Sequence, residues 1–181
     1  MNAPTQIETA RLILRKPVVA DTPLIYEAYA NDAEVTRYVT WRPYRTVADG
    51  EESSARRLAA WESGKSFSWV IILREGGELA GMISVRPDEW RVEFGYVLGR
   101  RWWGRGLMTE AARAVVDWAL AEPEVFRVWA VCDVDNLASA RVLEKAGMRR
   151  EGRLRRWAMH PNVSDEPRDC FCYARVKEDD G

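Results

Sequence analysis

Cysteine and histidine are scarce in this sequence, and long apolar runs are missing from it. The chain has three cysteines and one histidine, which supply neither a complete disulfide framework nor the paired motifs of a zinc site. No apolar run approaches the roughly 18 residues that a membrane span needs, and the opening Met-Asn-Ala-Pro-Thr-Gln is short and polar. We therefore expect a cytoplasmic protein with reduced thiols, no metal and no membrane partner.

An excess of charge of one sign is also missing. The 27 lysines and arginines nearly balance the 28 aspartates and glutamates, giving a net charge of −1. This balance argues against nucleic acid as the main partner and favours a small ligand. The length of 181 residues predicts one domain over 1–181, with a core over about 9–176, a short polar N-terminal segment and a charged C-terminal tail.

Alternating apolar runs and helical stripes divide the chain into elements. The strands are expected over 11–19, 66–74, 79–86, 91–98, 125–132, 148–159 and 169–176. The helices are expected over 21–31, 47–62, 107–120 and 135–147, the last with Asp135 as its N-cap. Because helices connect some strands and tight turns connect others, this order predicts an α/β fold whose mixed sheet is flanked by helices.

The stretch Arg-Arg-Trp-Trp-Gly-Arg-Gly, residues 100–106, links a predicted strand to a predicted helix. Gly104 and Gly106 allow the backbone to approach a ligand closely, and the first turn of a helix has N–H groups without internal partners. These groups and the positive end of the helix dipole form an anion site. The stretch lacks the Gly-Lys-Ser/Thr of a triphosphate loop and the glycine spacing of a dinucleotide fingerprint.

Arg101-x-x-Gly104-x-Gly106 resembles the pyrophosphate turn of the GNAT superfamily of N-acetyltransferases. Several further segments are similar to the RimJ/RimL-like branch, which includes ribosomal-protein N-terminal acetyltransferases. They are Thr9–Arg15 with Asp21, Phe94–Leu98, Thr109–Ala111, Asn136–Ser139, Leu143–Gly147, Glu151-Gly152 and Asp169. The resemblance covers nearly the whole chain and implies the GNAT fold, with a mixed, mostly antiparallel sheet.

The resemblance implies acetyl-coenzyme A (acetyl-CoA) as co-substrate. Its pyrophosphate is expected to contact the amides of Trp103, Gly104, Arg105, Gly106 and Leu107, with Arg101 near the start of the turn. Arg100 is either solvated or near the 3′-phosphate, and the same alternatives apply to the Arg105 side chain.

The resemblance also places the thioester against the strand 91–98, with free N–H groups at about Val97 and Leu98. Asn136 is expected to hydrogen-bond the pantetheine arm, although it is also a plausible cap residue beside Asp135. Ser139 lies one turn further, close to the sulfur.

Catalytic residues are predicted by analogy with the family. Many relatives carry a tyrosine acid seven residues after the asparagine, but this chain has Leu143 there. Either Ser139 protonates the thiolate, directly or through water, or no dedicated acid does. Glu93 is the expected general base, although a salt-bridged glutamate is the common alternative. The weaker candidates are Asp32, Glu34, Asp88 and His160, and we expect the histidine to be solvated.

The pKa of the acceptor amine decides how strong a base is needed. An α-amine has a pKa of about 8, so roughly 10% is neutral at pH 7, whereas deprotonating a lysine amine costs about 3 kcal/mol more. The lack of an unmistakable base therefore favours an α-amine.

Aromatic residues mark the expected acceptor site. The region before the second helix carries Tyr38 and Trp41, and we expect it to face Trp90. We assign Trp69, Trp118 and Trp129 to the core because they lie in apolar stripes.

Three functions remain open. The first is acetyl transfer to a primary amine, most readily a protein N-terminus, and the second is acetylation of a small-molecule amine. The third is a non-catalytic acyl-CoA-binding module. The sequence does not fix the oligomeric state. The resemblance makes a homodimer through the last strands one expectation, because such dimers are common in folds of this kind, and residues 170–173 suit either a covered edge or a core strand.

Overall fold

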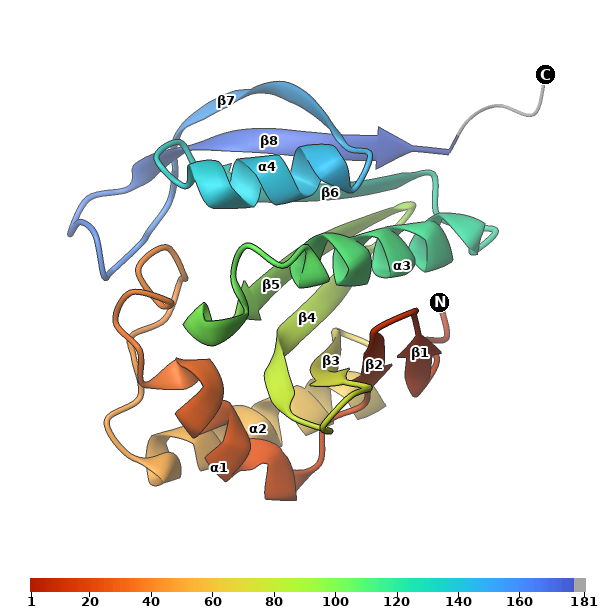
Figure 1. The fold of residues 1–181 in the computed structure, drawn as a ribbon. Coiled ribbons are helices and arrows are strands. Elements are labelled where there is room, and N and C mark those ends of the chain that lie inside the picture. Colours follow the sequence, from red (N-terminus) through yellow and green to blue (C-terminus); the bar gives the residue numbers. More distant parts are fainter. Residues whose placement is uncertain (178–181) are drawn as a thin grey trace.

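An eight-stranded sheet forms the centre of the protein in the computed structural model, which describes residues 1–177 (Figure 1). The strands are β1 (Gln6–Glu8), β2 (Leu12–Arg15), β3 (Phe67–Leu73), β4 (Leu79–Asp88), β5 (Arg91–Leu98), β6 (Arg127–Asp133), β7 (Arg149–Ala158) and β8 (Arg168–Val176). Their order across the sheet is β1-β2-β3-β4-β5-β6-β8-β7. Most of the predicted charged tail lies outside the described residues.

All neighbouring strands are antiparallel except β5 and β6. These two strands are parallel and pair only from Arg91–Arg127 to Glu93–Trp129. Beyond Glu93 they separate, so the later part of β5 is paired on its β4 side alone. The expected mixed, mostly antiparallel sheet is confirmed.

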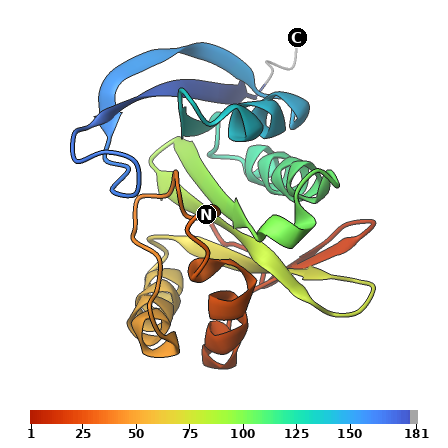
Figure 2. The same cartoon turned by 60° about the vertical axis from the view of Figure 1, so that its left-hand side comes forward.

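Helices cover both faces of the sheet. They are α1 (Thr22–Ile25), which continues as a π-helical turn over Tyr26–Ala30, α2 (Val47–Glu62), α3 (Leu107–Ala121) and α4 (Leu137–Lys145). Figure 2 shows α1 and α2 side by side across the sheet from α3 and α4. The stripe of α3 that contains Ala111, Val115 and Ala119 is fully buried, so helix packing follows from the apolar spacing.

The N-terminal strand differs from its prediction. The strand expected over 11–19 ends at Arg15, and β1 pairs with it antiparallel at Gln6–Arg15. Three residues without an alternating apolar pattern are too little sequence to reveal an edge strand. The predicted helix 21–31 is confirmed as helical over 22–30, where α1 continues into its π-helical turn.

The last two strands also settle one of the alternatives left open by the sequence. Strand β8 lies between β6 and β7, so residues 170–173 belong to an interior strand and β7 forms the edge. Cys170 and Tyr173 are buried accordingly. Within residues 1–177, no helix is both long and apolar enough to cross a membrane.

Candidate active site

The two faces of β5 carry different residues, because alternate residues of a strand point to opposite sides. Val92 and Phe94 belong to the core that contains α3 and α4, and Tyr96 packs against it. Val97 packs instead against the cluster that contains residues of α1. Glu93 shares the side of Val97. We call these sides the α3/α4 face and the α1/α2 face.

The turn before α3 has the geometry of an anion site. Gly104 and Gly106 both have φ of +74°, a conformation that other residues rarely adopt. A Cβ atom on Gly104 would meet nothing within 4 Å, so the space above the turn is open. Helix α3 begins at Leu107, and its first amides point toward this space without partners one turn back. This cradle fits a pyrophosphate group.

A partly buried network fixes this turn to the segment between β1 and β2. Glu110, in the first turn of α3, accepts hydrogen bonds from the Thr9 hydroxyl at 2.6 Å and the Arg11 amide at 2.8 Å. The Arg11 guanidinium binds the same carboxylate at 2.6 Å and donates to the Arg105 carbonyl at 2.9 Å. Burial alone would raise the pKa of Glu110, but these hydrogen bonds outweigh it and lower the pKa.

Glu110→Gln is expected to lower the free energy of unfolding at pH 7 by about 1 kcal/mol, a fall in Tm of about 2–4 °C. A lowered pKa stabilises the fold above the unfolded-state pKa, and this stabilisation is lost as the pH falls through the folded-state pKa. The difference in free energy of unfolding between wild type and variant should therefore become smaller below about pH 4.3. Thermal melts from pH 7 to 3, with the exposed Glu51→Gln as control, measure it. A gap that does not change with pH would contradict this role.

The arginine and tryptophan side chains of the turn are engaged within the protein. The Trp103 amide donates to the Arg100 carbonyl at 3.1 Å and its indole N–H donates to the Leu98 carbonyl at 2.7 Å. Arg101 pairs with Glu78 at 2.7 Å, and its guanidinium lies 4.5 Å from the Trp102 ring centre.

Arg100 and Arg105 are engaged as well. Arg100 binds Asp32 at 3.2 Å and Glu34 at 2.9 Å, whereas the Arg105 guanidinium lies 5.1 Å from the Trp102 ring centre. The Trp103 amide, one of the amides expected to contact the pyrophosphate, already donates to the Arg100 carbonyl. The candidate donors that remain are the amides of residues 104–107.

The open part of β5 coincides with the predicted thioester position. Val97 and Leu98 pair with Met82 and Gly81 of β4, and both lie past the last β5–β6 pair. Main-chain groups that face β6 in this part of the strand are available to a ligand. The Gly99 amide donates to the Ala80 carbonyl of β4, so by alternation the Leu98 main chain faces β6 and the Val97 amide faces β4. The Leu98 carbonyl is the exception, since Trp103 donates to it.

Ser139 lies at the start of α4 and contacts an unpredicted tyrosine. Its hydroxyl lies 2.7 Å from the Tyr96 phenol oxygen, which also donates to the Ser139 carbonyl at 3.2 Å. Burial raises the pKa of Tyr96, so the phenol stays protonated. Leu143 is fully buried in the core. A phenol from β5 thus contacts Ser139, although the usual tyrosine position of α4 holds a leucine. In the sequence, the only indication of this contact was that Tyr96 shares a strand face with Phe94.

Asn136 is the N-cap of α4, and the prediction that Asp135 has this role is wrong. The Asn136 side-chain oxygen accepts from the Ser139 amide at 3.1 Å, whereas Asp135 pairs with Arg168 at 2.6 Å. The cap uses the amide oxygen of Asn136. Cys132 lies near Ser139, and burial raises the pKa of its thiol to about 12, so it is not a competing thiolate nucleophile.

The α1/α2 face of the site carries polar groups and open space. Glu93 pairs with Arg86 at 2.9 Å, and Ser68 and Ser84 share a hydrogen bond of 2.8 Å. A Cβ atom on Gly95, the cross-strand partner of Ser84, would meet nothing within 4 Å. A ligand placed over Gly95 would meet these polar side chains.

Trp129 lies on the α1/α2 face. The assignment of Trp129 to the core, made from the sequence, is therefore wrong. It is paired with Glu93 at the last position before β5 and β6 separate. The core residues of β6 are its neighbours Val128 and Ala130. The indole N–H of Trp129 is buried without a hydrogen-bond partner in the described structure, which marks it as a donor for a ligand.

His160 is buried, contrary to the expectation of a solvated loop residue. Only 5% of it is exposed, and its Nε2 lies 3.7 Å from the Cys170 sulfur and 3.9 Å from Asp133. Burial raises the pKa of Cys170 to about 11. Burial also opposes ionisation of Asp133, but hydrogen bonds from Arg168 outweigh it and lower its pKa. The histidine is buried because the loop after β7 folds back over the sheet.

Two loops close together over the α1/α2 face. Asn162, in the loop between β7 and β8, donates to the carbonyls of Thr36 at 2.7 Å and Trp41 at 2.8 Å. The two views agree that this loop lies beside the segment between α1 and α2 (Figures 1 and 2). Tyr38 and Trp41, two of the predicted acceptor residues, belong to that segment.

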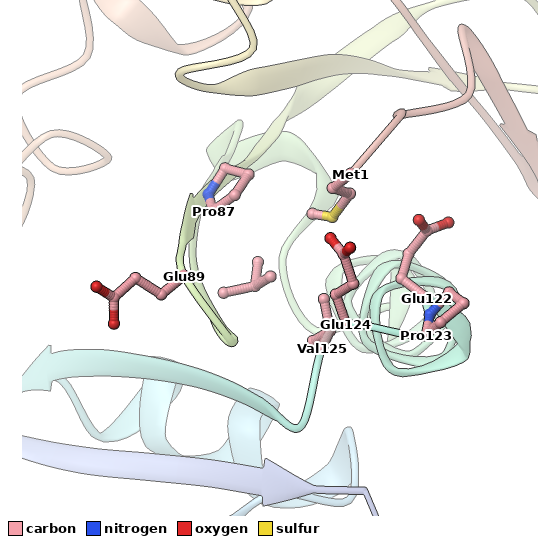
Figure 3. A pocket seen from close by; sticks show the side chains of 8 residues that line it. Met1, Pro87, Glu89, Glu122, Pro123, Glu124 and Val125 are labelled. Carbon is pink, nitrogen blue, oxygen red and sulfur yellow. The ribbon is translucent and has the colours of Figure 1, made fainter.

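Trp90 does not join them. It lies in the turn between β4 and β5, and its carbonyl accepts from the Phe126 amide at 2.9 Å. Trp41 packs against the cluster that includes Val97, which is seven residues, or roughly 23 Å, further along β5. The residue before Trp90, Glu89, lines a cavity of about 240 Å³ together with Glu122 and Met1 (Figure 3).

The described part of the chain contains no cluster of three or more histidine, cysteine or acidic residues that would hold a metal.

The other candidate bases are engaged in ion pairs. Asp32 and Glu34 bind Arg100, and Asp88 binds Arg91 at 2.6 Å.

Comparisons with known proteins match this geometry to a family. Residues 11–149 match the family described as an acetyltransferase (GNAT) domain. The uncharacterized N-acetyltransferase YoaA of Bacillus subtilis is 32% identical over 174 residues, which cover 94% of this chain and 96% of that protein.

Solved structures are similar over nearly their full length. A GNAT-family acetyltransferase from Bacillus anthracis has a TM-score of 0.83 and 30% identity, with 96% of this chain and 99% of that chain covered. RimL, a ribosomal α-N-protein acetyltransferase solved with coenzyme A, also has a TM-score of 0.83. Its identity is 20%, so the likeness, over 94% of this chain and 97% of that one, is one of fold.

Proposed function

Because the chain belongs to the GNAT family of acetyltransferases, we propose that it acetylates the N-terminal α-amine of a protein. The N-acetyltransferase class and the use of acetyl-CoA come with the family. The choice of an α-amine is supported by the state of the carboxylates. Asp32, Glu34 and Asp88 are held in ion pairs, and of the four candidates Glu93, itself paired with Arg86, is the one at the β5–β6 opening. A weakly basic amine needs the least help from such groups.

The residues on the α3/α4 face hold the acetyl donor. The amides of residues 104–107 bind the pyrophosphate, and the Leu98 amide of β5, which faces the opening toward β6, binds the pantetheine arm or thioester carbonyl. Asn136 keeps Ser139 at the start of α4, and the Asn136 side-chain N–H₂ group is a donor for the pantetheine arm. Acetyl-CoA supplies the activated acyl group when bound.

The acceptor approaches from the α1/α2 face, over Gly95. Its neutral amine attacks the thioester carbon, the carbon–sulfur bond breaks, and the amine loses a proton. Glu93, at the last β5–β6 pair, takes this proton directly or through water. Ser139 donates a proton to the departing thiolate, and Tyr96 replaces that proton on the serine or holds its hydroxyl in position.

A thiol-release assay with acetyl-CoA tests the proposal on two acceptor sets, short peptides with varied first residues and a panel of small amines. We expect turnover on peptides that depends on the first residue. Turnover on small amines alone would overturn the α-amine assignment, and coenzyme binding without any turnover would indicate a binding module.

In the same thiol-release assay, the Glu93→Gln variant should turn over roughly 100-fold more slowly than wild type. An unchanged rate would exclude Glu93 as base.

A further inference from the structure

A second cavity, of about 330 Å³, lies between α2 and the segment that carries Trp41. Trp41 and Tyr44 line one side, with ring centres 5.2 Å apart and planes tilted by 39°. Arg56 and Arg57 of α2 line the other side, and Ser66 lies just before β3. The cavity therefore combines aromatic surface with two cations.

Arg57 is the unusual member of this lining. It is partly buried, its Nε atom has no hydrogen-bond partner, and its terminal nitrogen donates to Ser54 at 3.3 Å. It forms no ion pair with a carboxylate of residues 1–177, whereas Arg56 pairs with Glu52. A partly buried cation without a counter-ion is destabilising, so an anion from outside the protein would complete the site.

Part of the Arg57 guanidinium is inside the protein, because its Nε atom is buried. Its positive charge opposes the rise that burial causes in the pKa of the Tyr29 phenol. Tyr29 is buried in the cluster under α1. The charge of Arg57 is thus held at the protein side of the cavity, where a planar carboxylate can bind its fork of N–H groups.

The cavity is close to the proposed acceptor path. Ser68 pairs with Ser84, and Ser84 pairs with Gly95, so these residues form a row across β3, β4 and β5. Ser66 precedes Ser68 by two residues on the same side of the chain. Two strand spacings across the sheet and two residues along it place Ser66 roughly 12 Å from Gly95. An extended peptide covers that distance in three to four residues.

We propose that this cavity binds an acidic side chain at the third or fourth residue of the acceptor polypeptide, with Arg57 as the ion-pair partner. The inference rests on the proposed function, because it places the α-amine over Gly95. Trp41 and Tyr44 cover the aliphatic part of the acidic side chain and the adjoining backbone. The site therefore selects an acceptor by the negative charge at its third or fourth residue.

A peptide series tests the position and the charge. One glutamate is moved from residue 2 to residue 6 of an otherwise neutral peptide, and each peptide is compared with its glutamine counterpart for KM and for affinity by calorimetry. We expect glutamate at residue 3 or 4 to lower KM and the peptide Kd by roughly 10- to 100-fold, as for a charge-assisted hydrogen bond. No preference at any position would overturn the proposal.

Arg57→Met removes the charge and keeps the length of the side chain. We expect the preference for glutamate to disappear while turnover of the glutamine peptides stays the same, and Arg57→Lys should keep part of it. Arg149→Met, at an exposed arginine of β7, is the matched control and should keep it fully. A preference that survives in a folded Arg57→Met variant would overturn the proposal.

Acetylation and the charge preference are measured separately, so their outcomes distinguish the acidic subsite from the proposed function. If no peptide is acetylated, calorimetry with the glutamate and glutamine peptides still measures the charge preference. If peptides are acetylated without a charge preference, the α-amine assignment stands and the acidic subsite does not. Binding of inorganic phosphate that Arg57→Met abolishes, together with no peptide preference, would identify a phosphate site and also overturn the proposal.

Discussion

Gly106→Val is expected to weaken acetyl-CoA binding by at least about 100-fold, the equivalent of two lost charge-assisted hydrogen bonds. Gly106 has φ of +74° at the N-cap of α3. A β-branched residue resists this conformation, so the turn must move and the amides of residues 104–107 no longer converge on one point. Calorimetric titration with acetyl-CoA measures the loss.

Gly77→Val is the matched control for backbone strain. Gly77 has φ of +67° in the turn between β3 and β4, and its substitution carries a similar conformational cost of about 1–3 kcal/mol. Both variants should lose thermal stability, but only Gly106→Val should lose coenzyme affinity. Unchanged affinity in Gly106→Val would show that the turn does not bind the pyrophosphate.

Ser139→Ala is expected to lower kcat by roughly 100-fold with little change in the affinity for acetyl-CoA. The hydroxyl is the proposed proton donor to the thiolate, and a proton donor acts on turnover more than on binding. Tyr96→Phe should lower kcat by roughly 10-fold and leave the KM for acetyl-CoA unchanged. It keeps the ring in the core and removes only the oxygen that lies 2.7 Å from the Ser139 hydroxyl.

The double variant shows whether Tyr96 acts through Ser139. If it does, Ser139→Ala with Tyr96→Phe will be no slower than Ser139→Ala alone, and Tyr96→Phe will shift the alkaline limb of the pH profile of kcat, which reports the proton donor. Ser63→Ala and Tyr26→Phe are controls for the loss of a hydroxyl elsewhere. A Ser139→Ala rate equal to that of wild type would remove both residues from the mechanism.

The turn before α3 was predictable because its residues act locally. Two glycines at φ of +74° and an apolar helical stripe that starts at Leu107 are features of a single segment. The same holds for the strands 66–74, 79–86 and 91–98, whose limits differ from β3, β4 and β5 by at most two residues. Local periodicity and turn chemistry were sufficient there.

Features that depend on distant partners were not predictable. Trp129 lies in an apolar run, and only the separation of β5 from β6 shows that its indole faces away from the core. His160 sits in a polar loop, and its burial requires the fold-back that brings it to Asp133 and Cys170. Arg57 is one of many arginines, and among the described residues only its buried Nε atom without a hydrogen-bond partner distinguishes it.

The short first strand illustrates a different limit. Residues 6–8 gain their strand conformation from pairing with β2 and carry no signal of their own. The order of β7 and β8 in the sheet was also not predictable. Both segments are recognisable as strands, but only the pairing of β8 with β6 makes β7 the edge strand. Sheet order is decided by long-range pairing and has no local pattern.

The central claim is that acetyl passes from acetyl-CoA to an α-amine over Gly95. The most direct test uses one peptide that has a free α-amine, an internal lysine and a glutamate at residue 4, incubated with acetyl-CoA and sequenced by mass spectrometry. We predict a single acetyl group on the α-amine. Acetylation of the lysine alone, or an unmodified peptide in the presence of bound coenzyme, would contradict the account.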